Sequence, residues 1–153
     1  MRIVVQRVLS AWVEWEQEST EHIAAGLLCL VGLHREDGPA LLEPMAEKLL
    51  HLRIFEDAAG RMNRSLLETG GGLVLVPQFT LYADCRRGRR PGFADALEPL
   101  AARALFERFV ERCRQHVPRA QAGSFGAQMR VHGVNDGPVT ILLDSAELGL
   151  PRL

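Results

Sequence analysis

Residues 70–84 combine a glycine turn, an apolar run and a polar end: Gly70-Gly71-Gly72-Leu73-Val74-Leu75-Val76-Pro77-Gln78-Phe79-Thr80-Leu81-Tyr82-Ala83-Asp84. The three glycines supply a turn, and the unbroken apolar run after them is typical of a strand covered on both faces. Pro77 has no N–H group to donate to a sheet, so the strand should kink or run along an edge there. The stretch therefore predicts a buried strand that ends in polar residues.

Two interpretations of this strand end are open. Main-chain N–H groups released from the sheet can converge on an oxyanion, while the amide of Gln78 and the hydroxyl of Thr80 can orient a ligand. The alternative is an ordinary strand end whose polar side chains face water. Taken alone, these residues favour the ordinary strand end.

Length and charge narrow the class of protein. The chain has 153 residues and is 47% hydrophobic, so we expect one domain, residues 1–153, with a substantial core. Its 18 basic and 19 acidic residues give a formal net charge of -1. Because no overall basic field attracts nucleic acid, any such contact must be local.

The cysteines and histidines indicate an intracellular protein without a metal. Cys29, Cys85 and Cys113 are an odd set without CxxC spacing, which suits reduced thiols in a cytoplasm. The histidines show no HExxH or other paired spacing, so we predict no metal site and no cofactor. Charge soon interrupts the apolar start of the chain, and no apolar run reaches membrane length. We therefore expect a cytoplasmic protein with neither membrane nor DNA as a partner.

Periodicity predicts an α/β fold with a mixed, largely antiparallel sheet and two main helices. One helix follows the turn at residues 37–39 and ends near Arg53. The other starts near Pro99 and carries an apolar stripe that we interpret as core: Phe106, Phe109, Val110, Cys113 and Val117. Residues 135–138 read as an ordinary hairpin turn, although a Gly-Pro bond can be cis at a cost of only about 0.5–1 kcal/mol. The expected strands and turns cover residues 2–9, 11–15, 16–21 (turn), 23–33, 54–60, 61–66, 72–78, 119–121, 123–131 and 135–144.

Two segments together resemble a known family. Pro77-Gln78-Phe79-Thr80-Leu81 and Asn135-Asp136-Gly137-Pro138-Val139-Thr140 are similar to motifs of the D-aminoacyl-tRNA deacylases, homodimeric editing enzymes that hydrolyse D-amino acids from tRNA. The resemblance runs over nearly the whole chain, and Phe93 is among the further residues that match. It implies a single three-layer domain with a barrel-like core, and a homodimer with its active sites at the subunit interface.

The resemblance also implies roles for individual residues. Gln78, Phe79 and Thr80 match the catalytic motif, whose main-chain amides hold the ester and the terminal adenosine of tRNA. Gly137 and Pro138 match a Gly-cisPro motif that enters the partner subunit's pocket and blocks L side chains. The remaining matches contact the substrate or brace the site: Arg7, which braces the Gly-cisPro motif across the interface, Pro77, and the adenosine-pocket residues Phe125, Gly126 and Met129.

One position departs from the family pattern. The family commonly has Ser where this chain has Pro77, and a sister group that acts on L-aminoacyl-tRNA also carries Pro-Gln there. Phe79 and Val139 nevertheless favour the D-type enzyme. Because proline removes a hydroxyl and an N–H group, any role of that Ser is dispensable or altered here.

The expected mechanism uses water rather than a nucleophilic side chain. The sequence shows no Ser-His-Asp pattern and no base beside Thr80. We expect an oriented water to attack the ester while amides near Phe79 and Thr80 stabilise the oxyanion. Since glycine lacks the side chain being tested, the resemblance also implies acceptance of mischarged glycyl-tRNA(Ala). A hydrolase with Thr80 as nucleophile remains a competing class.

An arginine-rich loop is the candidate contact to the tRNA backbone. Arg86, Arg87, Arg89 and Arg90 follow the motif strand within a few residues. A solvated loop is the commoner outcome for such a run. A non-catalytic RNA-binding module that uses this loop is therefore the third competing class.

Overall fold

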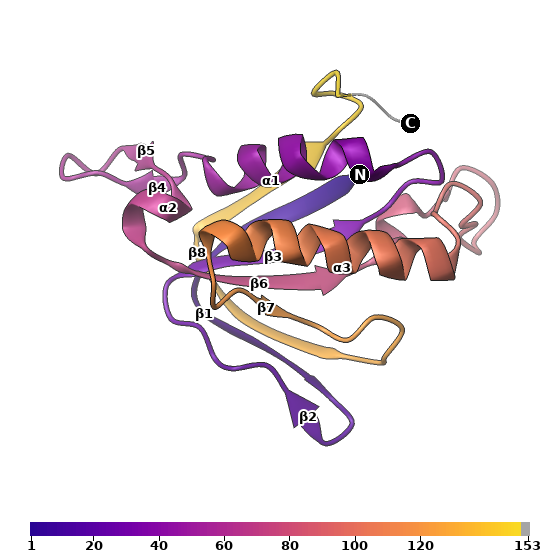
Figure 1. Cartoon of the computed structure of the whole chain (residues 1–153), viewed down its shortest axis with the longest axis horizontal. Helices are drawn as coiled ribbons and strands as arrows, with labels where there is room; N and C mark the ends of the chain where they lie inside the picture. Colours follow the sequence, from indigo (N-terminus) through magenta and orange to yellow (C-terminus); the bar gives the residue numbers. More distant parts are fainter. Residues whose placement is uncertain (151–153) are drawn as a thin grey trace.

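The computed structural model describes residues 1–150, which form one curled sheet, a small hairpin and two main helices (Figure 1). The strands are β1 (Arg2–Trp15), β2 (Glu18–Ser19), β3 (Gly26–Gly32), β4 (Phe55–Glu56), β5 (Met62–Arg64), β6 (Gly72–Pro77), β7 (Gln121–Ala122) and β8 (Arg130–Asp144). The helices are η1 (Pro39–Leu41), α1 (Leu42–Leu50), α2 (Leu66–Thr69), η2 (Phe79–Tyr82) and α3 (Pro99–His116). The predicted domain extends to residues 151–153, which lie outside the described residues.

The main sheet is mixed and largely antiparallel, as predicted. Its order is β2-β1-β3-β6-β7, and β8 pairs with the other edge of β1. β3 and β7 run parallel to β6, whereas β1 is antiparallel to β2, β3 and β8. The motif strand β6 therefore lies inside the sheet, which explains its continuous apolar run.

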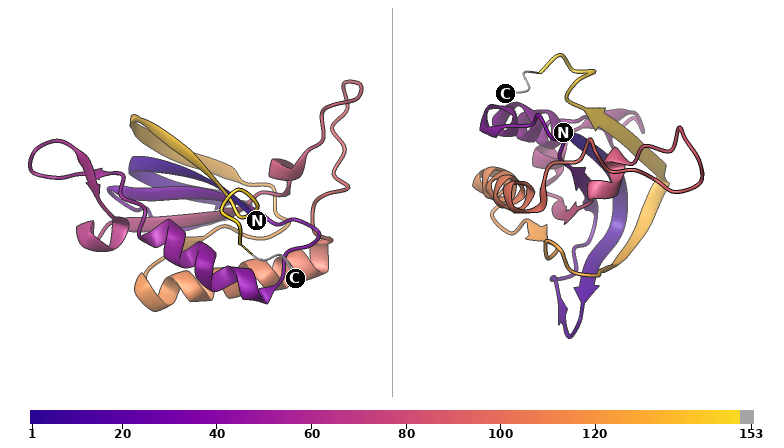
Figure 2. Two further views of the ribbon diagram at one scale, coloured as in Figure 1. Left: turned by 90° about the horizontal axis from the view of Figure 1, so that it is seen from above. Right: turned by 90° about the vertical axis from the view of Figure 1, so that its right-hand side faces the viewer.

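Both main helices pack on one face of the sheet (Figure 2, left). Leu49 of α1 and Phe109 of α3 are fully buried against alternate residues of β3 and β6, such as Cys29 and Leu75. This confirms the prediction of two main helices and of a core stripe on α3. No helix among residues 1–150 is long and apolar enough to cross a membrane.

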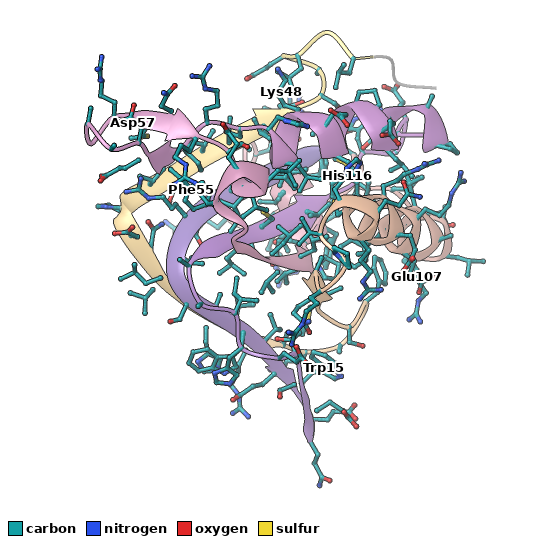
Figure 3. The ribbon with its side chains drawn as sticks, turned by 60° about the vertical axis from the view of Figure 1, so that its left-hand side comes forward. Trp15, Lys48, Phe55, Asp57, Glu107 and His116 are labelled. Atoms are coloured by element: carbon teal, nitrogen blue, oxygen red, sulfur yellow. The ribbon has the colours of Figure 1, made fainter. Side chains whose placement is uncertain are left out.

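Part of the opposite face of the sheet is covered by the sheet itself. The second half of β1 curls back, so that Ala11 and Val13 pack against Leu28, Val74 and Val76 (Figure 2, right). The tip of this arm, marked by Trp15, projects beyond the part of the sheet that the helices cover (Figure 3). Helices, sheet and curled arm make the layered, barrel-like arrangement that the family resemblance implied.

The hairpin turn predicted at residues 135–138 is wrong, because β8 continues through them. Gln6 pairs with Thr140 and Val8 with Asn135, so residues 136–139 lie opposite the single residue Arg7. The chain accommodates them as a bulge inside one long strand. Residues 2–9 and 11–15, expected as separate strands, likewise form the continuous β1.

Other elements also differ from the sequence prediction. The strand expected at residues 119–121 covers Gln121–Ala122, and the turn expected at residues 16–21 contains β2. Residues 123–129 form a loop rather than a strand, and Gly126 within it has a φ of 81°. The first main helix ends at Leu50, before the expected Arg53. Residues 66–69 form the short helix α2, because Ser65 and Glu68 cap it reciprocally.

Candidate active site

The end of β6 turns sharply into η2, as the position of Pro77 predicts. Pro77 is the last residue of the strand and pairs with Val31 of β3. The main-chain N–H of Gln78 then donates to the Val31 carbonyl at 2.8 Å. The turn into η2 follows at once and directs Phe79 and Thr80 outward, where both are exposed.

The turn leaves two main-chain donors unused. Within residues 1–150, the N–H groups of Phe79 and Thr80 donate to no protein acceptor. The side-chain amide of Gln78 donates to the hydroxyl of Thr80, which holds both polar side chains together. Adjacent, exposed N–H groups of this kind are the donors that stabilise an oxyanion.

Beside this turn lies a cavity of about 400 Å³ with a largely apolar wall. That size is within the range of small-molecule sites. Phe79 and Phe93 meet edge to face at its rim, with ring centroids 4.9 Å apart. The lining residues come from β3, the β6–η2 turn, α3 and three loops: Val31, Leu33, Pro77, Gln78, Phe79, Phe93, Ala96, Leu97, Glu98, Pro99, Ala102, Phe106, Phe125 and Gly126.

The structure brings together only part of the predicted site. Pro77, Gln78, Phe79, Phe125 and Gly126 all line the cavity. The other predicted residues lie outside its wall, some beside it and some on different elements: Arg7, Thr80, Arg86, Arg87, Arg89, Arg90, Met129, Gly137 and Pro138.

Met129 contributes indirectly. A Cβ atom built on Gly123 would lie 2.7 Å from the Met129 sulfur and 3.5 Å from Pro77. Gly123 therefore lets the loop of residues 123–129 lie close to the end of β6. Met129 itself packs against the cluster that contains Val74 and Val76 of β6.

Sequence reasoning missed several lining residues. Phe106 is 2% exposed and was assigned to the core stripe of α3, yet it and Ala102 also form the cavity wall. Phe93 and Glu98 come from the segment between the arginine loop and α3. Their only sequence signals were the family match at Phe93 and the position of Glu98 just before Pro99.

The cavity offers no general base beside Thr80. Among the described lining residues, Glu98 alone has an ionisable side chain, and its carboxylate caps α3 by accepting from the N–H groups of Leu100 and Ala101 at 3.3 and 2.7 Å. Burial raises the pKa of Cys113 to about 12 and that of Cys29 well above its usual range, so neither thiol is a ready nucleophile.

Arg7 braces the bulge in β8 from within the same chain. Its guanidinium is buried and donates to the main-chain carbonyls of Asp136 at 3.1 Å and Ile54 at 2.8 Å. The Asp136 carboxylate lies 3.5 Å from the Arg7 Nε atom. Arg7 therefore fixes the residue that immediately precedes Gly137.

Gly137 and Pro138 form the exposed crest of the bulge, and the bond between them is cis. Gly137 has a φ of 132°, which side chains rarely adopt. A Cβ atom there would lie 2.8 Å from Val139 Cγ2 and 3.2 Å from an Arg7 nitrogen. The exposed Gly137 in the bulge thus packs closely against the buried Arg7.

The four arginines of the arginine loop are all exposed, but they differ in whether they form an ion pair. Arg86 donates to the Asp84 carboxylate at two positions, both 2.8 Å, and these bonds lower the pKa of Asp84 to about 2. Arg87, Arg89 and Arg90 make no ion pair or side-chain hydrogen bond among residues 1–150. Their charges are therefore available to a ligand.

A group of possible metal ligands lies elsewhere. Glu43 and Glu47 of α1 and His116 of α3 are exposed and place their ligand atoms within 4.8 Å of one another. Glu43 also pairs with Arg112 at 3.3 Å. None of the three lines the cavity beside Phe79, so they add nothing to its chemistry.

This chain is similar over nearly its whole length to proteins described as D-aminoacyl-tRNA deacylases. A protein described as D-aminoacyl-tRNA deacylase from Myxococcus xanthus is 53% identical over 152 residues, covering 99% of each chain. One from Solidesulfovibrio magneticus with the same description is 55% identical over 155 residues, covering 97% of this chain and 98% of the relative.

A solved structure and a family model agree with these relatives. The structure of the c-Myc DNA Unwinding Element Binding Protein is 38% identical and covers 95% of this chain and 99% of its own, with a TM-score of 0.88. The family model described as D-Tyr-tRNA(Tyr) deacylase matches residues 4–144, which include both motifs of the candidate site. The chain belongs to the D-Tyr-tRNA(Tyr) deacylase family.

Proposed function

We propose that this protein hydrolyses the ester bond of D-aminoacyl-tRNA and releases a free D-amino acid and tRNA. The observation that carries the proposal is the pair of unused N–H groups, those of Phe79 and Thr80, beside an apolar cavity. Membership of the D-Tyr-tRNA(Tyr) deacylase family and the descriptions of the relatives support the same activity.

In this proposal the cavity binds the 3′-terminal adenosine. Single-stranded nucleotides are recognised by stacking on aromatic rings and by contacts to base edges. Phe79, Phe93 and Phe125 present such rings in the wall and at the rim of the cavity. An adenosine bound there places its ribose, and the ester it carries, beside the β6–η2 turn.

The reaction needs positioning and charge stabilisation rather than a strong nucleophile. Water adds to the ester carbonyl, the N–H groups of Phe79 and Thr80 hold the resulting oxyanion, and the bond to the ribose oxygen then breaks. The ribose oxygen takes up a proton, assisted by the neighbouring 2′-hydroxyl. An aminoacyl ester is already activated, so oxyanion stabilisation worth about 3–4 kcal/mol together with positioning can suffice.

Thr80 serves this site through its main chain. Its hydroxyl accepts from the Gln78 amide, and no described lining residue offers a base that could deprotonate it. A hydroxyl without an adjacent base is a weak nucleophile. Hydrolysis by water is therefore favoured over an acyl-enzyme on Thr80.

Chiral selection requires a second subunit in this proposal. Gly137 and Pro138 are exposed on the crest of the bulge and do not line the cavity of their own chain. Entering the partner subunit's site, their carbonyls occupy the space that an L side chain needs. D-amino acids and glycine are then accepted, and glycyl-tRNA(Ala) becomes a second substrate.

The surface around the bulge supports a homodimer. Within residues 1–150, β8 pairs only with β1, so its outer edge is unpaired. Val131, Val134 and Leu142 on β8 are between 42% and 52% exposed. An open strand edge that carries apolar side chains favours association with another chain.

Two further roles belong to the same proposal. Arg87, Arg89 and Arg90, with Arg86 held by Asp84, contact tRNA phosphates next to the cavity. The protein acts in the cytoplasm, where aminoacyl-tRNA is used, and requires neither a metal nor a cofactor.

The experiment measures amino acid release from D-Tyr-tRNA and L-Tyr-tRNA at substoichiometric enzyme, with a denaturing quench to trap any acyl-enzyme. The proposal expects many turnovers of the D substrate, background release from the L substrate and no trapped adduct. Binding without turnover would support the RNA-binding module instead. A trapped adduct would support a Thr80 nucleophile, and preferential L turnover would support the sister group.

A further inference from the structure

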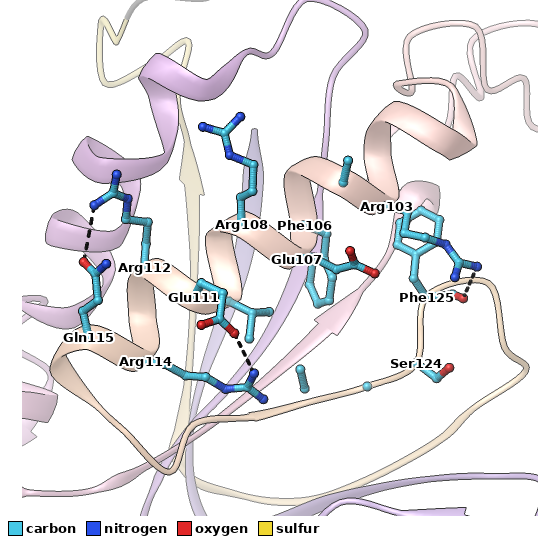
Figure 4. Close-up of a pocket in the computed structure, with 14 residues that line it drawn as sticks. Arg103, Phe106, Glu107, Arg108, Glu111, Arg112, Arg114, Gln115, Ser124 and Phe125 are labelled. Atoms are coloured by element: carbon cyan, nitrogen blue, oxygen red, sulfur yellow. Dashed lines mark hydrogen bonds and ion pairs between the residues drawn. The ribbon is translucent and has the colours of Figure 1, made fainter.

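A second, larger groove adjoins the proposed adenosine cavity. It has a volume of about 880 Å³ and runs between α3 and the segment of residues 122–125 (Figure 4). Phe106 and Phe125 line both the groove and the cavity. The two hollows are therefore neighbours that share one aromatic wall.

Arg103 stands at this shared wall. Its guanidinium lies over the Phe125 ring, 5.6 Å from the centroid, and donates to the Phe125 carbonyl at 3.2 Å. Figure 4 shows it reaching from α3 to the segment that carries Phe125. A permanent positive charge thus lies in the groove, beside the Phe125 ring that both hollows share.

The groove is mildly basic, although the chain as a whole is not. It is lined by four arginines and two glutamates, in a chain whose formal net charge is -1. Arg114 is neutralised by Glu111 at 2.9 Å, and Arg112 pairs with Glu43 at 3.3 Å. Among residues 1–150, Arg103 and Arg108 have no carboxylate partner.

The sugar-phosphate backbone of the RNA would have to run from the cavity into a neighbouring groove. An adenosine at the 3′ end of tRNA is joined to the preceding nucleotide through its 5′ phosphate, so the RNA must leave the cavity beside that phosphate. Single-stranded RNA is bound in grooves that combine cationic side chains with aromatic rings. The groove beside α3 combines arginines with the Phe106 and Phe125 rings that also line the cavity.

We propose that Arg103 binds the phosphate on the 5′ side of the terminal adenosine, and that the groove between α3 and residues 122–125 holds the preceding nucleotides of the tRNA 3′ end. This inference rests on the proposed function. It adds a positioning contact outside the cavity, and it assigns the path by which the single-stranded end reaches the ester-hydrolysing turn.

Two substrates test the contact, D-Tyr-tRNA and 2′(3′)-O-D-tyrosyl-adenosine, which carries the same ester but no phosphate. Arg103→Ala should lower kcat/KM for D-Tyr-tRNA by roughly 10- to 100-fold, mainly through KM, because the substitution removes a charge-assisted hydrogen bond. Turnover of tyrosyl-adenosine should be unaffected. The slope of log affinity for tRNA against log salt should become shallower by about 0.7, the value for one phosphate contact on a single strand.

Two further variants serve as controls for Arg103→Ala, one that keeps the charge and one that removes an arginine outside the groove. Arg103→Lys keeps the charge and should restore part of the activity on D-Tyr-tRNA. Arg119→Ala removes an exposed arginine that pairs with Glu21 outside the groove, and should leave turnover of both substrates unaffected.

The outcomes separate the inference from the proposed function. If Arg103→Ala slows both substrates equally, Arg103 only supports the Phe125 wall and the phosphate contact is overturned. Unchanged kcat/KM on both substrates overturns it as well. If the wild-type protein hydrolyses neither substrate, the proposed function fails, and the inference that rests on it fails too.

Discussion

The buried guanidinium of Arg7 holds the main-chain carbonyl of Asp136 at 3.1 Å, on the residue just before the Gly137-Pro138 crest. Arg7 is the single residue opposite the four-residue bulge of β8, and it also holds the Ile54 carbonyl. A surface feature proposed to act in another subunit is thus positioned by the core of its own chain.

Replacing Arg7 should therefore damage both stability and function. Arg7→Ala leaves the carbonyls of Asp136 and Ile54 without their donor, which should cost about 1–3 kcal/mol of unfolding free energy. Chemical denaturation and D-Tyr-tRNA hydrolysis should both show a decrease. Arg35→Ala, at an exposed arginine 3.5 Å from Asp95, should change neither quantity. Full activity in Arg7→Ala would show that the bulge needs no brace.

Gly137→Ala should impair hydrolysis of D-Tyr-tRNA more than its effect on stability explains. The residue has a φ of 132°, and the new Cβ atom would lie 2.8 Å from Val139 Cγ2, so the crest must shift. The expected cost in stability is about 1–3 kcal/mol. The hydrolysis rates of the variant and the wild-type protein should be compared under conditions where both have the same folded fraction, as measured by circular dichroism.

Gly60→Ala is the matched control for Gly137→Ala. Gly60 also has a positive φ, 74°, but no atom lies within 4 Å of its Cβ position. The variant should be somewhat less stable because of backbone strain and should keep its activity. Equal activity of the two variants would argue against a role for the crest.

Thr80→Ala should retain most of its activity, because the substitution keeps the main-chain N–H groups that are proposed to hold the oxyanion. It removes only the hydrogen bond from Gln78. A neutral hydrogen bond contributes about 0.5–1.5 kcal/mol, so the rate on D-Tyr-tRNA should fall by no more than about tenfold. A folded, tRNA-binding variant with background activity would instead make the hydroxyl the nucleophile.

The free arginines of the exposed loop should contribute to tRNA affinity. The quantity to measure is the slope of log affinity for tRNA against log salt concentration. In Arg87→Ala/Arg89→Ala, this slope should become shallower by about one unit for each phosphate that an arginine no longer neutralises. Arg61→Ala/Arg119→Ala removes the same charge from exposed positions outside the loop and should keep the wild-type slope. An identical slope in both double variants would show that the loop is a solvated surface that makes no phosphate contact.

Local patterns predicted the elements that hold the site. The apolar run before Pro77 identified β6 and its end, and the stripe ending at Val117 identified α3. These signals depend on covalent geometry and on side-chain periodicity, which neighbouring residues determine. The same local rules suggested a turn at residues 135–138, where pairing with the distant β1 instead extends β8 through a bulge.

The cavity itself could not be predicted, because its wall combines segments far apart in the sequence. Phe93, Glu98 and Phe106 meet Gln78 only after β3, β6 and α3 have packed. Phe106 shows why: helical spacing marks a residue as buried but does not distinguish a core position from the wall of a cavity. Similarly, the charge of Arg7 gave no indication of the two carbonyls that surround it.

The proposed exclusion of L side chains by Gly137 and Pro138 can be tested by comparing hydrolysis rates on three substrates. Hydrolysis of D-Tyr-tRNA, L-Tyr-tRNA and glycyl-tRNA(Ala) should be measured with one enzyme preparation at equal substrate concentration. We expect turnover of the D and glycyl substrates, since neither places a side chain where the Gly137-Pro138 carbonyls are proposed to lie. The L substrate should show only uncatalysed hydrolysis. Comparable rates on D-Tyr-tRNA and L-Tyr-tRNA would contradict it.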